Sequence, residues 1–384
     1  MTPVFRAGAP TTSSVGFYPG MRSDMTTPGF APDRRTFLRA AGTLAGGAAF
    51  ATPAPTRAAD DTADNTVAAL YEELTAAQRK VMCFDWDKKG GYGGLPLRLH
   101  VTNNWAVSPV KIGDLTGDQR ALVGDVLNSV LAEGWAAKLE RQAKDDTGKA
   151  WTEDRKIAIF GIPGTGKCQC VISGFHLTFR AGREKDSPVA FGGAICHGHQ
   201  PSGFHEKPGH PGNIFWYQAQ EAHKVYRMLD GKQQKLAVIE KGMPYYEFDG
   251  KIDRTPVLPQ SKLDRALEPD VRFRGAKSAD LTGLPINEMT RDQKDAMRKV
   301  LGAMMEPYRE AYRERVTACL DKQGGFEKCH LIFYKEHTLG KDGKWDNWRV
   351  EGPAFVWYFR GFPHVHIWVH VAENPDVPIT SHFG

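Results

Sequence analysis

Three segments of the chain begin with the same helix-start pattern and continue with apolar residues at helical spacing. Each reads Thr-x-x-Gln, with the threonines at positions 75, 116 and 290. In such a capping box the threonine side chain accepts from the third helical amide, and the glutamine reaches back to the threonine amide. Apolar residues recur at spacings of three and four from Leu122 to Leu131, which is typical of one buried helix face. We therefore expect a helix directly after each threonine, the last with a bend at Pro307, and interpret the shared pattern as structural rather than as a functional repeat.

Short runs rich in β-branched and aromatic residues predict strands between and after these helices. Residues 156–160 and 170–180 flank a turn rich in Gly and Pro, so they are expected to pair as a hairpin. A further helix is expected over 213–229. Three more strands are expected near the C-terminus, at 330–334, 354–360 and 364–371. Helices that flank a mostly antiparallel sheet make an α+β fold.

The N-terminus carries the features of a twin-arginine export signal. Arg34 and Arg35 precede a weakly apolar run over 40–51, which is too short to cross a bilayer as a helix. We expect residues 1–59 to be a signal peptide and leader, 60–70 a polar linker, and 71–384 a single large globular domain. The protein is therefore expected to be periplasmic or secreted, with the twin-arginine export machinery as a partner. No stable membrane span is expected.

The leader accounts for most of the net charge. Residues 1–59 hold six arginines and two acids, which contribute +4 of the formal +5. The remaining chain is nearly neutral, so its composition gives no electrostatic reason to propose nucleic acid as a partner.

Six cysteines are compatible with two interpretations. In an oxidising compartment they could form disulfides, and Cys319 and Cys329 could close a local loop around a Gly-Gly turn. Small buried thiols explain them equally well.

One segment resembles a phosphate-binding loop. Residues 161–168 read Gly-Ile-Pro-Gly-Thr-Gly-Lys-Cys, which matches the first part of that motif. Cys168 stands where a magnesium-binding Ser or Thr is required, and a strand is expected where the motif needs a helix. We interpret the segment as a hairpin loop and expect no nucleotide cofactor.

Histidines at alternate positions of the last strand are the strongest candidates for chemistry. His364, His366, Trp368 and His370 share one face of a strand, because strand side chains alternate. His364 and His366 are close enough to bind one ion, whereas His370 is too distant. Imidazole is the commonest protein ligand for Zn, Cu and Fe.

A third metal ligand is expected from another part of the chain. His176 is the first choice, because alternation places it on the polar face of the strand expected over 170–180. His199 and His197 follow, in a segment over 196–212 whose Gly and Pro content is typical of a loop. The expected cofactor is a transition metal, either Zn, Cu or Fe.

At these residues the sequence resembles a bacterial family of secreted proteins known only as a domain of unknown function, number 3500. The strand Ser-Gly-Phe-His176-Leu-Thr-Phe-Arg and the ending His364-Val-His366-Ile-Trp match motifs of that family, and the resemblance runs from about Leu70 to the C-terminus. Two positions depart from it: Phe175 replaces a histidine, and Val371-Ala-Glu replaces an Arg-Asp ending. The resemblance implies no known activity, but its polar positions include His176, His364 and His366.

Two classes of function follow from these residues. The first is an exported metal-binding protein, which could be a Zn hydrolase, a Cu or Fe oxidoreductase, or a protein without catalysis. In an enzyme of this kind, Glu351 would be a base or an orienting carboxylate. The alternative is a non-catalytic periplasmic module that binds a small molecule or a partner through 196–212 and the tryptophans. Those tryptophans, at 345, 348, 357 and 368, are also compatible with a packed core.

Overall fold

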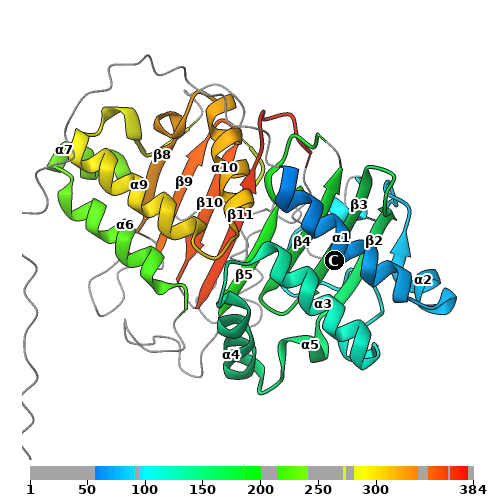
Figure 1. Ribbon diagram of the computed structural model, residues 1–384. Helices are drawn as coiled ribbons and strands as arrows, with labels where there is room; N and C mark the ends of the chain where they lie inside the picture. Colours follow the sequence, from blue (N-terminus) through cyan, green and yellow to red (C-terminus); the bar gives the residue numbers. More distant parts are fainter. Residues whose placement is uncertain are drawn as a thin grey trace, which may run out of the picture. The chain divides into compact units, whose positions relative to one another are not determined.

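An 11-stranded, mostly antiparallel sheet forms the centre of the molecule, and helices cover one of its faces (Figure 1). The structure is a computed structural model and describes residues 57–90, 95–184, 186–199, 214–240, 271–273, 281–335, 345–361 and 364–378. All of them belong to one compact unit, Pro55–Gly384. The α+β fold predicted from the sequence is confirmed.

The helices of the described residues are α1 (Arg57–Glu73), α2 (Ala76–Met82), α3 (Gly117–Val130), α4 (Trp135–Thr147), α5 (Trp151–Asp154), α6 (Trp216–Met228), α7 (Gly231–Ala237), α9 (Arg291–Met305) and α10 (Glu310–Lys322). The strands are β1 (Cys83–Phe84), β2 (Lys156–Ile162), β3 (Lys167–Gly174), β4 (Leu177–Glu184), β5 (Ile195–His199), β6 (Val238–Ile239), β7 (Leu284–Pro285), β8 (His330–Tyr334), β9 (Asn347–Gly352), β10 (Phe355–Arg360) and β11 (Val365–Val371).

The predicted helix starts are confirmed. The threonines at 75, 116 and 290 each cap a helix, and each capping box is complete. The expected bend at Pro307 is a break between α9 and α10. The helix expected over 213–229 is α6. The segment expected to be a linker, 60–70, instead lies within α1, because Val67 and Leu70 are fully buried against the core.

The strands depart from the prediction in two ways. The run 170–180 is two strands, β3 and β4, because the chain turns back between Gly174 and Leu177. Strands β5 and β9 are additional, and so are the two-residue strands β1, β6 and β7. The segment resembling a phosphate-binding loop joins the antiparallel strands β2 and β3, which confirms that it is a hairpin loop. All six cysteines are free thiols and all but Cys83 are buried, so no disulfide joins Cys319 to Cys329.

The two halves of the chain repeat the same succession of elements. The first half contains helices α2, α3 and α4, and their counterparts in the second half are α7, α9 and α10. Strands β1–β5 correspond in the same order to β6 and β8–β11. The sheet order is β1-β2-β3-β4-β5-β11-β10-β9-β8-β6, in which β1 is parallel to β2 and β6 is parallel to β8. The halves meet at the antiparallel pair β5–β11, where Ile195 lies opposite Val369. A pseudo-twofold axis therefore passes through this pair.

Hydrogen bonds repeat between the halves as well. Gln119 donates to the Glu73 carbonyl and bonds a second glutamine, at position 78. Its counterpart Gln293 donates to the Met228 carbonyl and bonds the glutamine at position 233. The second and third Thr-x-x-Gln segments are thus equivalent parts of a structural repeat.

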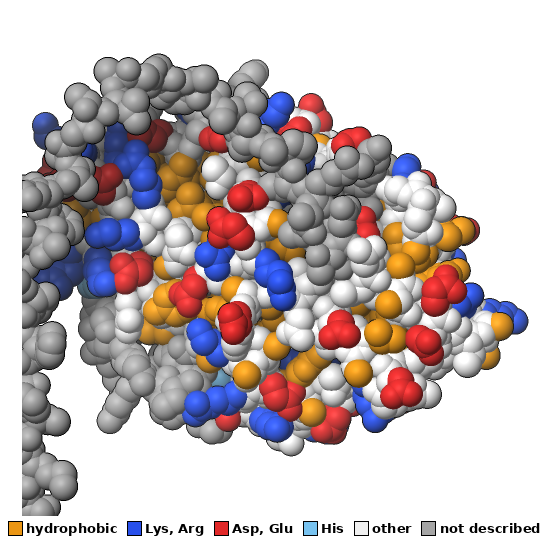
Figure 2. All heavy atoms as spheres, viewed as in Figure 1, with side chains coloured by type: hydrophobic (Ala, Val, Ile, Leu, Met, Phe, Trp, Pro, Cys, Tyr) orange, Lys and Arg blue, Asp and Glu red, His pale blue; other side chains and the backbone are white. Residues whose placement is uncertain are grey.

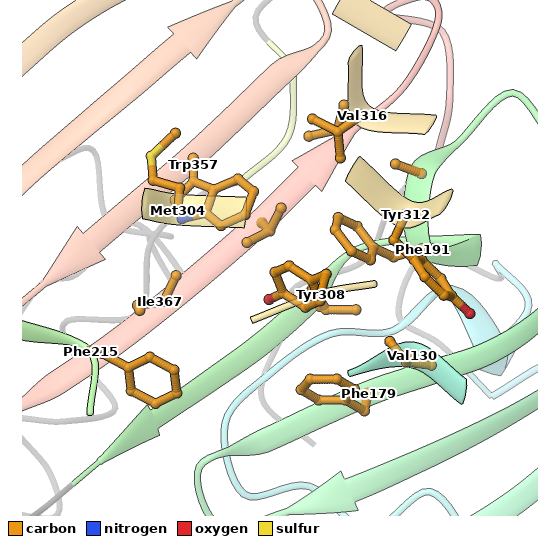
Figure 3. Packing of buried hydrophobic residues seen from close by; sticks show 14 of the residues in the cluster. Val130, Phe179, Phe191, Phe215, Met304, Tyr308, Tyr312, Val316, Trp357 and Ile367 are labelled. Atoms are coloured by element: carbon orange, nitrogen blue, oxygen red, sulfur yellow. The ribbon is translucent and has the colours of Figure 1, made fainter. Parts of the chain in front are cut away.

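The main hydrophobic core lies between the sheet and its helices (Figure 3). Ile367 and Trp357 point from β11 and β10 towards Met304, Tyr308 and other large side chains. Trp345, Trp348 and Trp357 are members of this core, whereas Trp368 belongs to a smaller cluster on the opposite face. The four tryptophans are therefore packing residues. Because side chains on both faces of β11 are buried, the histidine-bearing face is also covered.

The surface shows no strong charge asymmetry on the face drawn in Figure 2, where basic and acidic side chains of the described residues are interspersed. None of the helices in the described ranges is long and apolar enough to cross a membrane.

Candidate metal centre

The alternation of side chains on β11 is as expected from the sequence. Val365, Ile367 and Val369 pack into the helix-side core, so His364 and His366 point to the other face. Both histidines are 1% exposed. His370 lies apart from them: its Nδ1 is 3.1 Å from the Val271 carbonyl, to which it donates.

His176 reaches these two histidines from a turn rather than from a strand face, which corrects the sequence-based placement. It is the second residue of the tight turn between β3 and β4, with a φ of 57°. This left-handed conformation is uncommon for a residue other than glycine and often marks functional sites. The backbone is held on both sides: the His176 amide donates to Asn103 Oδ1 (2.9 Å), and the Gly198 amide donates to the His176 carbonyl (3.1 Å).

The three histidine rings converge on one point. The Nε2 atom of His364 is 3.1 Å from that of His176 and 2.7 Å from that of His366. One ring nitrogen from each residue lies within 4.8 Å of the other two. Three nitrogens bound tetrahedrally to one ion at 2.0–2.1 Å stand about 3.3 Å apart. The His176–His364 and His364–His366 separations are thus within about 0.6 Å of the spacing that such an ion requires.

Gly198 makes room for this arrangement. A Cβ atom at this position would lie 2.9 Å from His366 Cδ2 and 3.2 Å from His176 Cδ2, and closer still to the Val365 carbonyl oxygen. Only glycine therefore allows β5 to pass beneath the rings. The stretch 196–199 is part of β5, whereas the sequence composition predicted a loop; residues 200–212 of that prediction lie outside the described residues.

A buried carboxylate, Asp146, orients His176. Its two oxygens lie 2.7 Å from His176 Nδ1 and 2.8 Å from His199 Nδ1, and its side chain is fully buried. His199 is therefore joined to the cluster through Asp146 and is not one of the three converging nitrogens. His197, on the helix side of β5, lies against Phe215 and Tyr308 instead.

Arg360 approaches the cluster from the opposite side. Its guanidinium donates to His366 Nδ1 at 2.8 Å. A guanidinium can only donate, so Nδ1 of His366 is an acceptor and a neutral His366 carries its hydrogen on Nε2. For His176 the opposite holds, because the Asp146 carboxylate accepts from Nδ1 and leaves a lone pair on Nε2.

The environment keeps the three rings neutral. Burial lowers the pKa of His364 to about 2 and that of His366 well below its ordinary value, and the positive Arg360 adds to both shifts. Burial also lowers the pKa of His176, although the hydrogen bond to Asp146 opposes this. Burial pushes the pKa of Asp146 upward, but the hydrogen bonds from His176 and His199 outweigh it and hold this pKa well below its usual range. Neutral imidazole is the form that binds metals.

Glu351 is not brought to the histidines. It lies on β9 opposite Val356 of β10, and Val356 in turn lies opposite His370 of β11. His370 is four residues from His366, which is about 13 Å along the strand. Its carboxylate pairs with Arg349 at 2.7 Å inside the protein. Glu351 was expected to be a base or orienting carboxylate, but the structure places it on β9 with Arg349 as its partner and not beside the three histidines.

The sequence profile of a protein family, described as "Protein of unknown function (DUF3500)", matches residues 56–373. The chain belongs to this family. The resemblance noted in the strand and C-terminal motifs is therefore confirmed for nearly the whole described region. No curated protein and no solved structure matches the sequence. The family description carries no activity, so a function for this member has to come from the site itself.

Two residues of the site were not identified from the sequence, although each carries a signal. Asp146 lies in the last turn of α4, where the helix dipole disfavours an acidic side chain. Such a placement suggests that another interaction holds it there. Arg360 ends a strand whose other residues are all apolar or aromatic. A charged side chain on a fully buried strand needs a polar partner, which here is His366.

Proposed function

We propose that this protein is a metal-binding protein whose ion is held by His176, His364 and His366. The observation that carries the proposal is the convergence of three buried, neutral imidazoles on one point. Imidazole donors suit Zn, Cu and Fe. The Asp146 carboxylate that fixes the Nδ1 hydrogen of His176 is the partner commonly found behind metal-binding histidines.

The hydrogen atoms of the cluster support a bound cation. If His364 has a lone pair on Nε2, that lone pair faces the lone pair of His176 across 3.1 Å. If it has a hydrogen there, that hydrogen faces the one on His366 across 2.7 Å. Either way one contact is mismatched, and an added proton is disfavoured because burial lowers the pKa of all three rings. A metal ion accepts from the facing lone pairs and removes the mismatch.

The second half of the chain provides an internal comparison. Counted from the matched turns and strand pairs, His176 corresponds to Ala354, His364 to Ala190 and His366 to Gly192. The Gly198 amide bond to His176 is repeated by the Ala372 amide bond to Ala354. Asp146 corresponds to Leu320, a core residue. The turn between β9 and β10 and helix α10 therefore form without a histidine or a carboxylate at these positions, whereas Ala190 and Gly192 lie in a 3-10 helix and not in a strand.

Metal analysis of the purified chain tests the proposal. We expect one equivalent of a transition metal after reconstitution, and a loss of most of it in His176→Ala and His364→Ala. His370→Ala is the matched control, because His370 is also buried on the same face of β11 but contacts Val271. Equal metal content in His364→Ala and His370→Ala, or none in the unaltered protein at micromolar free metal, would overturn the proposal.

We also propose export by the twin-arginine route to the periplasm or beyond, on the basis of Arg34, Arg35 and the short apolar run that follows. These positions lie outside the described residues. Fractionation of a bacterial host that produces the chain tests this. We expect the processed form outside the cytoplasm, and retention of the double variant Arg34→Lys, Arg35→Lys; export of the variant at the normal rate would contradict it.

A further inference from the structure

The surroundings of the three histidines discriminate between ions of different charge. This inference rests on the proposed metal site and concerns which ion it selects. We infer that the site selects a monovalent ion, Cu(I), over divalent ions such as Zn(II), and that Arg360 sets this preference. The lone pairs, the charges and the number of donors at the site all favour this ion.

The hydrogen bonds make the three histidines unequal donors. Asp146 fixes a lone pair on Nε2 of His176. Arg360 occupies the Nδ1 lone pair of His366 and so leaves a hydrogen on its Nε2. Only His176 and His364 can offer Nε2 lone pairs without a change at His366. Cu(I) is satisfied by two or three imidazoles, so this arrangement suits it.

The charges near the site favour a lower ionic charge. An imidazole ligand carries no charge, and the negative charge of Asp146, which contacts His176, is shared with His199. Arg360 donates to His366, and the Arg155 guanidinium donates to the carbonyl of Phe175, next to His176. Arg155 is 6% and Arg360 is 1% exposed, so water screens neither charge well. A dication is repelled by each guanidinium twice as strongly as a monocation.

The number of donors points the same way. Zn(II) in proteins takes four ligands. Within the described part of the chain, these three histidines are the only group of three or more His, Cys, Asp or Glu residues with ligand atoms this close together. The rings are 1% exposed, which limits the water that could complete a tetrahedral shell. A trigonal or two-coordinate Cu(I) needs no fourth ligand.

Competition titrations on the full chain test the inference. Cu(I) is added under anaerobic conditions in the presence of bicinchoninate, and Zn(II) in the presence of a chromophoric chelator. We expect one equivalent of Cu(I), which excess Zn(II) does not displace. Arg360→Met removes the charge at similar length, and Arg360→Lys keeps it. The repulsion energy is proportional to the charge of the ion, so its removal in Arg360→Met should favour Zn(II) twice as much as Cu(I) in free energy. If the affinity for Cu(I) rises on the order of 10-fold, the affinity for Zn(II) should rise on the order of 100-fold.

The outcomes are distinct. Arg360→Lys should behave like the unaltered protein, and circular dichroism melts check that each variant is folded. Preferential binding of Zn(II) by the unaltered protein, or an equal effect of Arg360→Met on both ions, overturns the inference but leaves the metal site in place. Failure of the unaltered protein to bind either ion overturns the proposed function itself.

Discussion

Asp146 provides the sharpest test of how the site is held together. Its carboxylate accepts from both His176 and His199, at 2.7 and 2.8 Å. An asparagine in its place has nearly the same shape but presents one acceptor and one donor. In Asp146→Asn one of the two histidines must therefore face an NH2 group, and its ring hydrogen must move from Nδ1 to Nε2. If this is His176, the lone pair that faces the ion is lost.

The magnitude follows from the two hydrogen bonds. Removal of a carboxylate behind a metal-binding histidine typically costs 10–100-fold in metal affinity, which is about 1.4–2.7 kcal/mol. Rotation of the amide to keep its oxygen on His176 leaves a neutral bond in place of a charge-assisted one, so it does not restore the affinity. In the metal-free protein the free energy of unfolding should fall by about 2 kcal/mol, because bonds to charged groups are stronger than neutral ones.

The assay compares Asp146→Asn with Asp145→Asn. Asp145 is the preceding residue of the same helix and is exposed, so its variant has the same change in formal charge without a change at the histidines. Metal affinity is measured by competition and stability by urea unfolding. The reasoning is refuted if the two variants bind metal equally well, because Asp146 would then have no part in positioning His176.

Three further outcomes are expected. Gly198→Ala should cost several kcal/mol of stability and disrupt metal binding, because its Cβ would press on His366 and the Val365 carbonyl. The control Gly124→Ala, in helix α3, has nothing within 4 Å of its Cβ and should be neutral or stabilise by up to about 1 kcal/mol. Urea unfolding distinguishes the two variants. Burial lowers the pKa of His197 to about 3, so the neutral ring contributes stability above the unfolded pKa near 6.5, and this stability is lost as the pH falls. Because of His197, the unfolding free energy at pH 5 should be about 2 kcal/mol lower than at pH 8. His197→Leu should remove this contribution to the pH dependence. Gln119→Ala and Gln293→Ala should lower the melting temperature by similar amounts and add in the double variant, because the two residues are equivalent, lie in different helices and bond different partners. Strongly unequal effects would count against the repeat.

Local patterns predicted part of the fold well. The capping boxes and the alternation on β11 were correct because both depend on neighbouring residues, within one helix turn or along one strand. Strand β5 was missed because Gly198 and the prolines beyond it resemble a loop. The strand forms there because β11, which is distant in sequence, pairs with it, and glycine is needed beneath the histidine rings.

The convergence of His176, His364 and His366 was predicted, but the residues that support them were not. His176 was chosen for a strand-face position that it does not have, yet the turn between β3 and β4 delivers it to the same place. Asp146 and Arg360 meet the histidines only through the packing of α4 and the pairing of β10 with β11. The contact of Asp146 with His176 joins a helix to a turn 30 positions further along the chain, and no local spacing encodes it. Arg360 is only six positions from His366 and faces it across the β10–β11 hairpin. Glu351 was expected at the histidines, but it lies on β9 and pairs with Arg349, two positions away.

The pseudo-twofold arrangement has a consequence for the order of assembly. His176 belongs to the first half of the chain and His364 to the second, with 188 positions between them. Neither half alone presents three converging nitrogens, so the proposed metal site can form only after β5 and β11 have paired. That pairing joins segments of high sequence separation and is therefore among the slower steps of folding. If the proposed ion binds, its uptake is expected late in folding, and the rate of uptake during refolding would report when the two halves have joined.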